Sequence, residues 1–395
     1  MALPHAHVDE RATVCAFTQK VRKFCRMLGE RGWEIVLYAG ADSQPAGASE
    51  LVPLFSEAER EEWYGPFDLN RLPLVAGAWS ASQPSFRVTN ERAVAELRRR
   101  LEPGDLVLLT GGLAQKPIAE ALPGALVAEW AAGYEGWFAS FVCFESSAWR
   151  HHCYGQRGIN DGRWYDAVIP NFFDPHEWPL CQGPGDYLLF MGRLTARKGP
   201  HVAAEVARAA GMPLLVAGAG CAEARPGLVV CQDGTRLEGD VRYLGTVGGE
   251  ERARLMAGAR ALLAPTLYVE PFGAVAVEAQ LCGTPAITTD WGAFAETVVQ
   301  GVTGFRFHTL AEGVEAVERA GDLDPGRVRA EALARYSLEA VAPLYEQWLQ
   351  RLAGLWGDGW YTAPHPALAI GLARRGALSG RRHRSLLGRR GQGSL

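Results

Sequence analysis

The sequence predicts an α/β protein with two doubly wound parallel-sheet domains. Between residues 187 and 307, short apolar runs alternate with helical segments, and this series is typical of parallel strands joined by crossover helices. In the first half, continuous apolar runs at 106–110, 125–129 and 141–144 have the composition of strands that are buried on both faces. The chain of 395 residues is long enough for two such cores.

Composition and charge narrow the class of protein. Hydrophobic residues make up 48% of the chain and charged residues 21%, as in ordinary globular proteins, and the formal net charge of -4 argues against a general nucleic-acid binder. The amino terminus has no apolar leader, and no uninterrupted apolar run reaches about 18 residues, so we expect no membrane span. The eight cysteines form no C-x-x-C pair, which favours buried free thiols and a cytoplasmic location.

The first half of the chain, residues 1–180, is expected to form one domain. Residues 14–31 have the periodicity of an amphipathic helix and residues 34–38 that of a strand. Because this helix precedes the strand, the first strand is expected to be shortened or missing. Residues 41–86 predict loop and short helix, either an acceptor-side insertion or a variable surface segment.

Two further features of the first half concern helices and metals. Residues 88–101 predict a strong helix, and residues 166–171 predict the last strand of the domain. His151, His152 and Cys153 are adjacent, so on a helix they would point about 100° apart, and no partner set with zinc spacing follows them. We therefore expect no metal site there.

The second half, residues 186–336, is expected to form the other domain. Strands are predicted at 187–191, 213–217, 227–231, 241–244, 261–265, 285–288 and 303–307, with helices near 200–211, 249–259, 272–282 and 309–320. Residues 326–356 are predicted to be helical. From 361 to 395 the chain carries seven arginines and no acidic residue, which predicts a disordered basic tail that is dispensable or makes a weak peripheral contact with an acidic membrane.

The central motif is Glu270-Pro-Phe-Gly-Ala-Val-Ala-Val-Glu278. Pro271 suits the first turn of a helix, so Glu270 is expected in the preceding loop and Glu278 almost two turns into the helix. Gly273 lets a ligand approach the backbone, and free N–H groups at a helix start bind anions. Two carboxylates beside such an anion site suit a phosphorylated, hydroxyl-rich ligand such as a nucleotide sugar, although the bare spacing also arises often by chance.

This motif and its neighbours carry a resemblance. The segment is similar to the E-x7-E motif of retaining glycosyltransferases of family GT4, whose GT-B fold has two Rossmann-like domains facing a cleft. The similarity continues in order over residues 187–307, through the segments 190–199, 216–220, 241–245, 283–285, 291–296 and 301–305. It is much weaker in the first half, where the family's glycine pair in the first loop is absent.

The resemblance implies roles for particular residues. Arg193 and Lys198 would bind the donor pyrophosphate, and Glu270 would face the sugar, so these three form the catalytic set. Glu278 would bind the ribose hydroxyls. The remaining donor-binding positions implied by the resemblance are Gly192, Gly218, Gly220, Gly245, Val247, Phe272, Gly273 and Ala274. The helix over 337–356 would cross back onto the first domain.

Acceptor-side candidates come from the ends of the predicted strands in the first domain. Because open α/β sheets bind ligands at the carboxyl ends of their strands, Glu129, Trp130 and Tyr134 are expected in the cleft. Relatives often carry a histidine at an equivalent place. Here the sequence reads Glu129-Trp130, so that histidine's role cannot be transferred.

The predicted function is transfer of a hexose from a nucleotide-diphosphate sugar to an unknown hydroxyl acceptor, with retention of configuration. UDP is the expected nucleotide, with GDP or ADP as alternatives. The only D-x-D motif, at 322–324, is expected to cap a helix, and no metal or other cofactor is expected. Two other functions fit the same fold: a reversible phosphorylase or sucrose-synthase-like enzyme, and a non-catalytic nucleotide-sugar binding protein.

Overall fold

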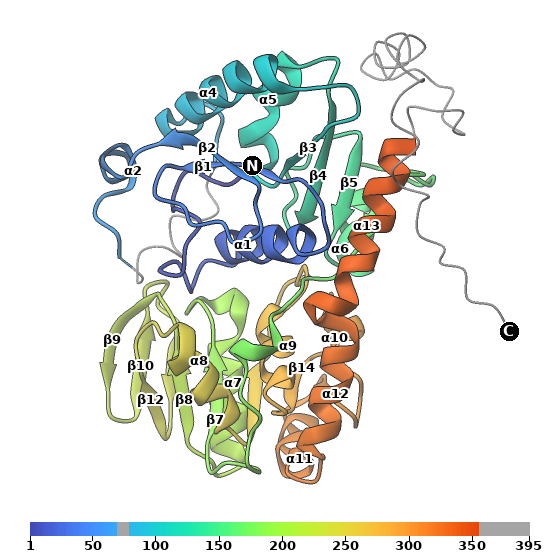
Figure 1. The fold of residues 1–395 in the computed structure, drawn as a ribbon. Coiled ribbons are helices and arrows are strands. Elements are labelled where there is room, and N and C mark those ends of the chain that lie inside the picture. The colour runs from blue at the N-terminus through green and yellow to red at the C-terminus, as the bar shows by residue number, and fades with distance from the viewer. Residues whose placement is uncertain (69–78, 355–395) are drawn as a thin grey trace, which may run out of the picture.

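A computed structural model describes residues 1–68 and 79–354 and has two α/β domains, one above the other in Figure 1. The strands and helices of the first domain are α1 (Ala16–Gly29), β1 (Val36–Gly40), β2 (Glu50–Phe55), α2 (Glu57–Tyr64), α4 (Pro84–Arg100), β3 (Leu106–Leu109), η1 (Gly112–Gln115), α5 (Lys116–Ala121), β4 (Leu126–Ala132), β5 (Phe141–Phe144), α6 (Ser147–Gln156) and β6 (Ala167–Val168). A short 3-10 turn, η2 (Pro175–Glu177), lies in the connection to the second domain.

The second domain contains a six-stranded parallel sheet in the order β12-β8-β7-β13-β14-β15. Its elements are β7 (Leu188–Met191), η3 (Ala196–Lys198), α7 (Pro200–Ala209), β8 (Leu214–Ala217), β12 (Val241–Tyr243), α8 (Gly249–Ala257), β13 (Ala261–Ala264), α9 (Ala274–Leu281), β14 (Ala286–Thr289), α10 (Phe294–Thr297), β15 (Gly304–Phe307) and α11 (Leu310–Ala320). Helices cover both faces, so most strand positions are buried. Counted along the chain the strand order is 3-2-1-4-5-6, which is the Rossmann arrangement.

One of the predicted parallel strands belongs elsewhere. Residues 227–231 were expected in the parallel series, but β10 (Leu228–Cys231) lies between β9 (Cys221–Arg225) and β11 (Arg236–Glu238) in a separate antiparallel sheet. The insertion extends from the β8–β12 connection. Its partners β9 and β11 are short and largely exposed, so they lack the apolar runs by which buried strands are recognised.

The sheet of the first domain is divided into two parts. Strands β1 and β2 form one parallel pair, and β3, β4, β5 and β6 form a parallel sheet in that order. Between them lies the amino terminus: the Met1 amino group donates to the carbonyl of Leu108 in β3, and the Ala2 N–H donates to that of Tyr38 in β1. Residues 1–15 contain no assigned strand, which agrees with the expectation that the first strand is shortened or missing. A cavity of about 830 Å³ lies between β1 and β3.

Residues 41–86 contain more regular structure than the sequence predicts. Strand β2 pairs in parallel with β1, and α2 begins with a capping box formed by Ser56 and Glu59. Pro53 within β2 weakens the strand signal, but β2 is an edge strand, where a missing N–H is tolerated. Part of this segment, 69–78, lies outside the described residues.

The carboxyl-terminal helices link the two domains. Helix α12 (Pro325–Tyr336) packs on α9, and α13 (Leu338–Gly354) runs along the first domain (Figure 1), where it packs on α1. The ring of Tyr345 meets that of Phe24 at 5.2 Å between centroids. Asp324 accepts a hydrogen bond from the N–H of Gly326 at the start of α12, so the D-x-D motif caps this helix, as predicted.

The sequence-based expectations on membrane spans, cysteines and the basic segment have the following outcomes. No helix within residues 1–68 and 79–354 has the length and apolar character needed to cross a bilayer. The eight cysteines are all free thiols, and seven of them are buried. The basic segment 361–395 lies outside the described residues.

Candidate functional site

The site lies where the strand order of the second domain reverses, between β7 and β13. Loops that follow adjacent strands on either side of such a reversal diverge and leave a crevice. The loop after β7 carries Lys198, and the loop after β13 carries Glu270. Their side chains meet across the crevice, with Nζ of Lys198 at 2.7 Å from Oε2 of Glu270.

The environment of this ion pair is largely closed to solvent. Glu270 is 8% exposed, and its Oε2 also accepts a hydrogen bond of 3.3 Å from the hydroxyl of Thr266. Burial alone would lower the pKa of Lys198, but Glu270, together with Tyr268, more than offsets it, and the pKa is raised. Lys198 is therefore a fixed positive charge at neutral pH.

The loop between β13 and α9 has a special backbone conformation. Gly273 adopts φ +76° immediately before α9, and a Cβ there would overlap the ring of Phe294. The N–H of Ala293 donates to the backbone carbonyl of Glu270 at 2.9 Å, so the loop after β14 holds the backbone of Glu270 in place. Glycine at this position thus leaves the first N–H groups of α9 open, as an anion site requires.

A cavity of about 750 Å³ opens between the domains beside the ion pair. Its second-domain wall includes Arg193, Arg197 and Lys198, and its first-domain wall includes segments 111–114 and 133–136 together with Trp149 and His152. Arg193 is exposed, and within residues 1–68 and 79–354 its side chain forms no hydrogen bond or ion pair. Arg197 instead lies over the ring of Tyr268, at 4.7 Å from its centroid.

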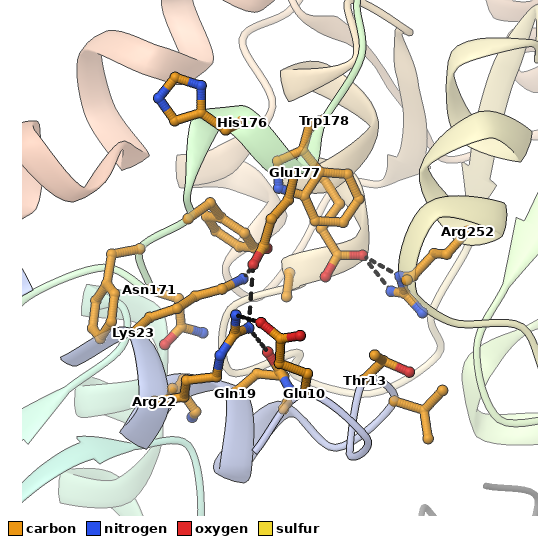
Figure 2. A pocket seen from close by; sticks show the side chains of 18 of the residues that line it. Glu10, Thr13, Gln19, Arg22, Lys23, Asn171, His176, Glu177, Trp178 and Arg252 are labelled. Carbon is orange, nitrogen blue, oxygen red and sulfur yellow. Dashed lines mark hydrogen bonds and ion pairs between the residues drawn. The ribbon is translucent and has the colours of Figure 1, made fainter. Parts of the chain in front are cut away.

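A second interdomain cavity, of about 540 Å³, contains Glu278. Figure 2 shows its two sides, with Arg252 on α8 opposite Arg22 and Lys23 on α1. Arg252 binds Glu278 through two nitrogens, Nε at 2.9 Å and Nη2, which both contact Oε2. Ala274, at the start of α9, lines the same cavity.

Both cavities are therefore lined by the segment 271–278. Its amino terminus and Glu278 face the 540 Å³ cavity, while Pro271, just before the helix, faces the 750 Å³ cavity. The first domain contacts this loop directly, because the hydroxyl of Ser146 donates to the carbonyl of Pro271 at 2.6 Å. Glu296 of the second domain accepts from the N–H groups of Ser147 and Ala148 at the start of α6.

The remaining predicted donor positions lie in the surrounding loops. The Gly218 N–H donates to the carbonyl of Gly245 at 2.8 Å, and side chains at Gly218 or Gly220 would collide with the carbonyls of Gly192 and Leu194. These glycines hold the loops after β7, β8 and β12 together. A side chain at Gly245 would meet no atom within 4 Å, so that backbone faces open space. Val247 and Phe272 are buried in the core.

Two of the three acceptor-side candidates are not in the cleft. Strand β4 continues to Ala132, three residues beyond the predicted end, so Glu129 and Trp130 lie within the strand. Trp130 is core, 4.2 Å from Phe24 between ring centroids. Glu129 is fully buried and accepts from the N–H groups of Phe138 and Ala139 and from the Tyr134 hydroxyl. The expectation that Glu129 and Trp130 face an acceptor was wrong; Tyr134 does line the 750 Å³ cavity.

The described residues contain one group with metal-ligand spacing, at His7, Asp42 and Glu57. Nδ1 of His7 accepts from the Asp42 N–H at 3.2 Å, and Nε2 lies 2.8 Å from Glu57. Oε2 of Glu57 also contacts Nε of Arg60 at 2.9 Å, so this carboxylate already has a cationic partner.

Comparison with known proteins identifies the second domain. Residues 181–323 match the family model described as Glycosyl transferases group 1. This segment is a glycosyl transferases group 1 domain. It contains Arg193, Lys198, Glu270 and Glu278, so the residues of the two cavities on the second-domain side all lie within the matched region.

Curated relatives match the same part of the chain. A glycogen synthase of Mycobacterium tuberculosis is 35% identical over 148 residues, which is 35% of this chain and 35% of the relative. A D-inositol 3-phosphate glycosyltransferase of Mycobacterium bovis is 34% identical over 161 residues, 38% of this chain and 32% of the relative. The chain thus matches only about a third of the length of these relatives.

Solved structures match over both domains. The sucrose-phosphate synthase of Thermosynechococcus elongatus has a TM-score of 0.60 at 19% identity, covering 86% of this chain and 94% of its own. Anabaena HepE, in complex with UDP and glucose, has a TM-score of 0.60 at 17% identity, with 87% and 98% covered. A glycosyltransferase involved in avilamycin A biosynthesis has a TM-score of 0.57 at 23% identity, with 85% and 90% covered. These likenesses establish the GT-B fold.

The sequence-based assignment of site residues missed three residues of the cavities. Arg252 binds Glu278, Tyr268 packs against Arg197 and Lys198, and His152 enters the 750 Å³ cavity from the first domain. Arg252 and Glu278 stand on different helices, 26 residues apart, so no periodic pattern links them. His152 stacks on Trp149 at 4.8 Å between ring centroids, and only the fold reveals this orientation.

Proposed function

We propose that this protein transfers a hexose from a nucleotide-diphosphate sugar, with UDP-sugars preferred, to a hydroxyl acceptor with retention of configuration. The observation that carries the proposal is the Lys198–Glu270 pair at 2.7 Å, set at the strand-order reversal between two cavities. Such a donor requires a carboxylate to bind the sugar hydroxyls, and a cation and a helix amino terminus to bind the phosphates. The site offers all three.

The donor is proposed to span both cavities. Its nucleoside would occupy the 540 Å³ cavity, with the ribose hydroxyls on Glu278, and its diphosphate would lie at the amino terminus of α9 near Arg193 and Lys198. The sugar would then reach Glu270 at the edge of the 750 Å³ cavity. The preference for UDP draws support from HepE, whose structures hold UDP with glucose and UDP-glucose.

The chemistry follows from the charges. As the bond between sugar and diphosphate breaks, negative charge grows on the departing phosphate, and preorganised cations stabilise it. Arg193 and Lys198 supply that charge without a metal ion. Since Lys198 and Thr266 both bind Oε2 of Glu270, this carboxylate is better suited to orient the sugar than to attack it. The departing phosphate would then take the proton of the acceptor hydroxyl on the same face.

The test is a transfer assay on the purified protein. UDP-, GDP- and ADP-hexoses are offered with a panel of hydroxyl acceptors in the presence of a metal chelator, and nucleotide release is followed together with product formation. We expect one nucleotide to be released with stoichiometric glycoside formation, and product NMR to show the donor's anomeric configuration. No transfer from any donor, or an inverted product, contradicts the proposal.

A second candidate is a nucleotide-sugar binding protein without transferase activity. It is favoured by the loop before α1, which lacks the family's glycine pair and places Thr13 against Gly248 and Gly249. A loop in that position narrows the space above the donor phosphates. Nucleotide binding with a defined stoichiometry, together with no turnover across the acceptor panel, would favour this candidate over the transferase.

A further inference from the structure

We infer that Arg252 is a positioning residue that orients the Glu278 carboxylate toward the ribose hydroxyls of the donor; this inference rests on the proposed function. Arg252 stands on α8 and Glu278 on α9, two helices that pack against each other. Both side chains line the 540 Å³ cavity, and neither is wholly enclosed, with 20% of the arginine and 13% of the glutamate side chain exposed.

The contact is asymmetric. Nε and Nη2 of Arg252 both approach Oε2 of Glu278, and within residues 1–68 and 79–354 no hydrogen-bond donor contacts Oε1. Figure 2 shows both contacts leaving the Arg252 guanidinium. One carboxylate oxygen is thus held by a charge-assisted pair of hydrogen bonds, while the other is left for a ligand in the cavity.

Holding the carboxylate has two consequences for a nucleotide. A glutamate side chain loses rotamer freedom when it binds, and Arg252 imposes that restriction before the ligand arrives. The arginine also offsets the negative charge of Glu278, which lies in the same cavity as the α9 amino terminus, where the diphosphate is proposed to sit. Without Arg252, the carboxylate would be both mobile and repulsive toward that diphosphate.

Other cations of the cavity cannot replace this contact. Lys23 pairs with Glu177 at the opposite wall, Arg22 contacts Glu10 and Glu177, and Lys20 pairs with Glu145. Figure 2 shows Arg22 and Lys23 grouped around Glu177, away from Arg252. Among the described residues, Arg252 is the cation bound to Glu278.

The experiment compares two ligands by calorimetric titration: the nucleoside diphosphate that the wild type binds best, and its 2′,3′-dideoxy analogue. The single variants are Arg252→Met, Arg252→Lys and Glu278→Gln. A double variant that combines Arg252→Met with Glu278→Gln completes a mutant cycle. Arg254→Met is the matched control, because Arg254 is an exposed arginine on the same helix.

If Arg252 acts through Glu278, Arg252→Met weakens binding of the ribose-containing ligand about tenfold and leaves binding of the dideoxy analogue nearly unchanged. Arg252→Lys gives an intermediate loss, Arg254→Met gives none, and Arg252→Met has little further effect once Glu278→Gln is present. Thermal unfolding of each variant separates loss of binding from loss of folding.

Four outcomes overturn the inference. An equal loss for both ligands means that Arg252 contacts the diphosphate or base, and no loss for either means that it has no role in binding. If the wild type binds the two ligands with equal affinity, Glu278 does not bind the ribose hydroxyls. Absence of any nucleotide binding by the wild type refutes the proposed function, and the inference falls with it.

Discussion

Replacement of Lys198 by Met tests the ion pair at the centre of the site. The change leaves the Glu270 carboxylate, which is 8% exposed, without its cation. Removing one partner of a fully buried pair costs about 3–5 kcal/mol. Since 23% of the Lys198 side chain is exposed, solvent screening reduces the expected loss to about 2–3 kcal/mol. If the second domain unfolds as one unit, that lowers its Tm by about 4–12 °C, the range for domains of about 150–250 residues.

The control is Lys116→Met. Lys116 pairs with Glu120 on the surface of α5, where the side chains are 47% and 61% exposed, so the expected change in stability is about 0.5 kcal/mol or less. In the double variant Lys198→Met with Glu270→Gln, both charges are gone, and the combined loss should fall short of the sum of the single losses by about 1 kcal/mol or more.

Differential scanning calorimetry and denaturant unfolding measure these values. Two results together would contradict a stabilising ion pair: Lys198→Met has a Tm within about 1 °C of the wild type, and the stability losses of Lys198→Met and Glu270→Gln sum to that of the double variant.

The pH dependence of stability gives a further check. Because the pKa of Lys198 is raised in the folded protein, its contribution is fully present below the unfolded pKa of about 10.4. It is lost only as the pH rises through the folded pKa, so the difference between wild type and Lys198→Met is constant from about pH 7 to 10.

Three other changes have defined outcomes. Gly273→Ala should abolish nucleotide binding and destabilise the protein, because φ is +76° and the new Cβ overlaps the ring of Phe294. The control Gly301→Ala, at φ +70° with no atom within 4 Å of the new Cβ, should lower the free energy of unfolding by only about 1–2 kcal/mol. Calorimetric titration and unfolding assays distinguish the two variants. Glu129→Ala should cost about 2–4 kcal/mol in unfolding assays, because the partly buried N–H of Phe138 and the buried N–H of Ala139 lose their acceptor, and nucleotide affinity should not change. Burial disfavours the thiolate of Cys15, but His5, with Nε2 at 3.0 Å from Sγ, lowers the pKa to about 7. The absorbance of the Cys15 thiolate should therefore show a midpoint near pH 7. The wild type should exceed Cys15→Ser in free energy of unfolding by most above about pH 9, and this difference should disappear as the pH falls through 7.

The second domain could be predicted from the sequence almost element by element. Its parallel strands are buried on both faces, so each is a short apolar run such as Leu188–Met191, and the intervening helices carry an apolar stripe. Glu270 and Glu278 could be assigned to a loop and a helix because Pro271 and Gly273 mark the boundary. The antiparallel insertion was missed because its outer strands are exposed and polar.

The first domain shows why sequence reasoning fails at strand ends. The error on Glu129 and Trp130 arises from an irregularity in β4, where the register with β5 shifts and Ala131 adopts φ +49°. This bulge lets the strand continue past an apparent end, and no residue with a strong turn preference marks it. Contacts between distant side chains, such as Arg252 with Glu278, depend on how α8 and α9 pack, which local patterns do not encode.

The division of the first domain's sheet has a consequence for its local stability. Side chains of the β1–β2 pair share two apolar clusters with the four strands beginning at β3, but only two hydrogen bonds, from Met1 and Ala2, are described between these two parts of the sheet, and a cavity lies beside them. Cooperative units of a protein open with free energies set by the contacts that join them. The β1–β2 pair should therefore open separately, and its amide hydrogens should exchange with solvent sooner than those of the continuous six-stranded sheet. A nucleotide bound to the second domain would slow exchange around α9 while leaving β1 and β2 unprotected.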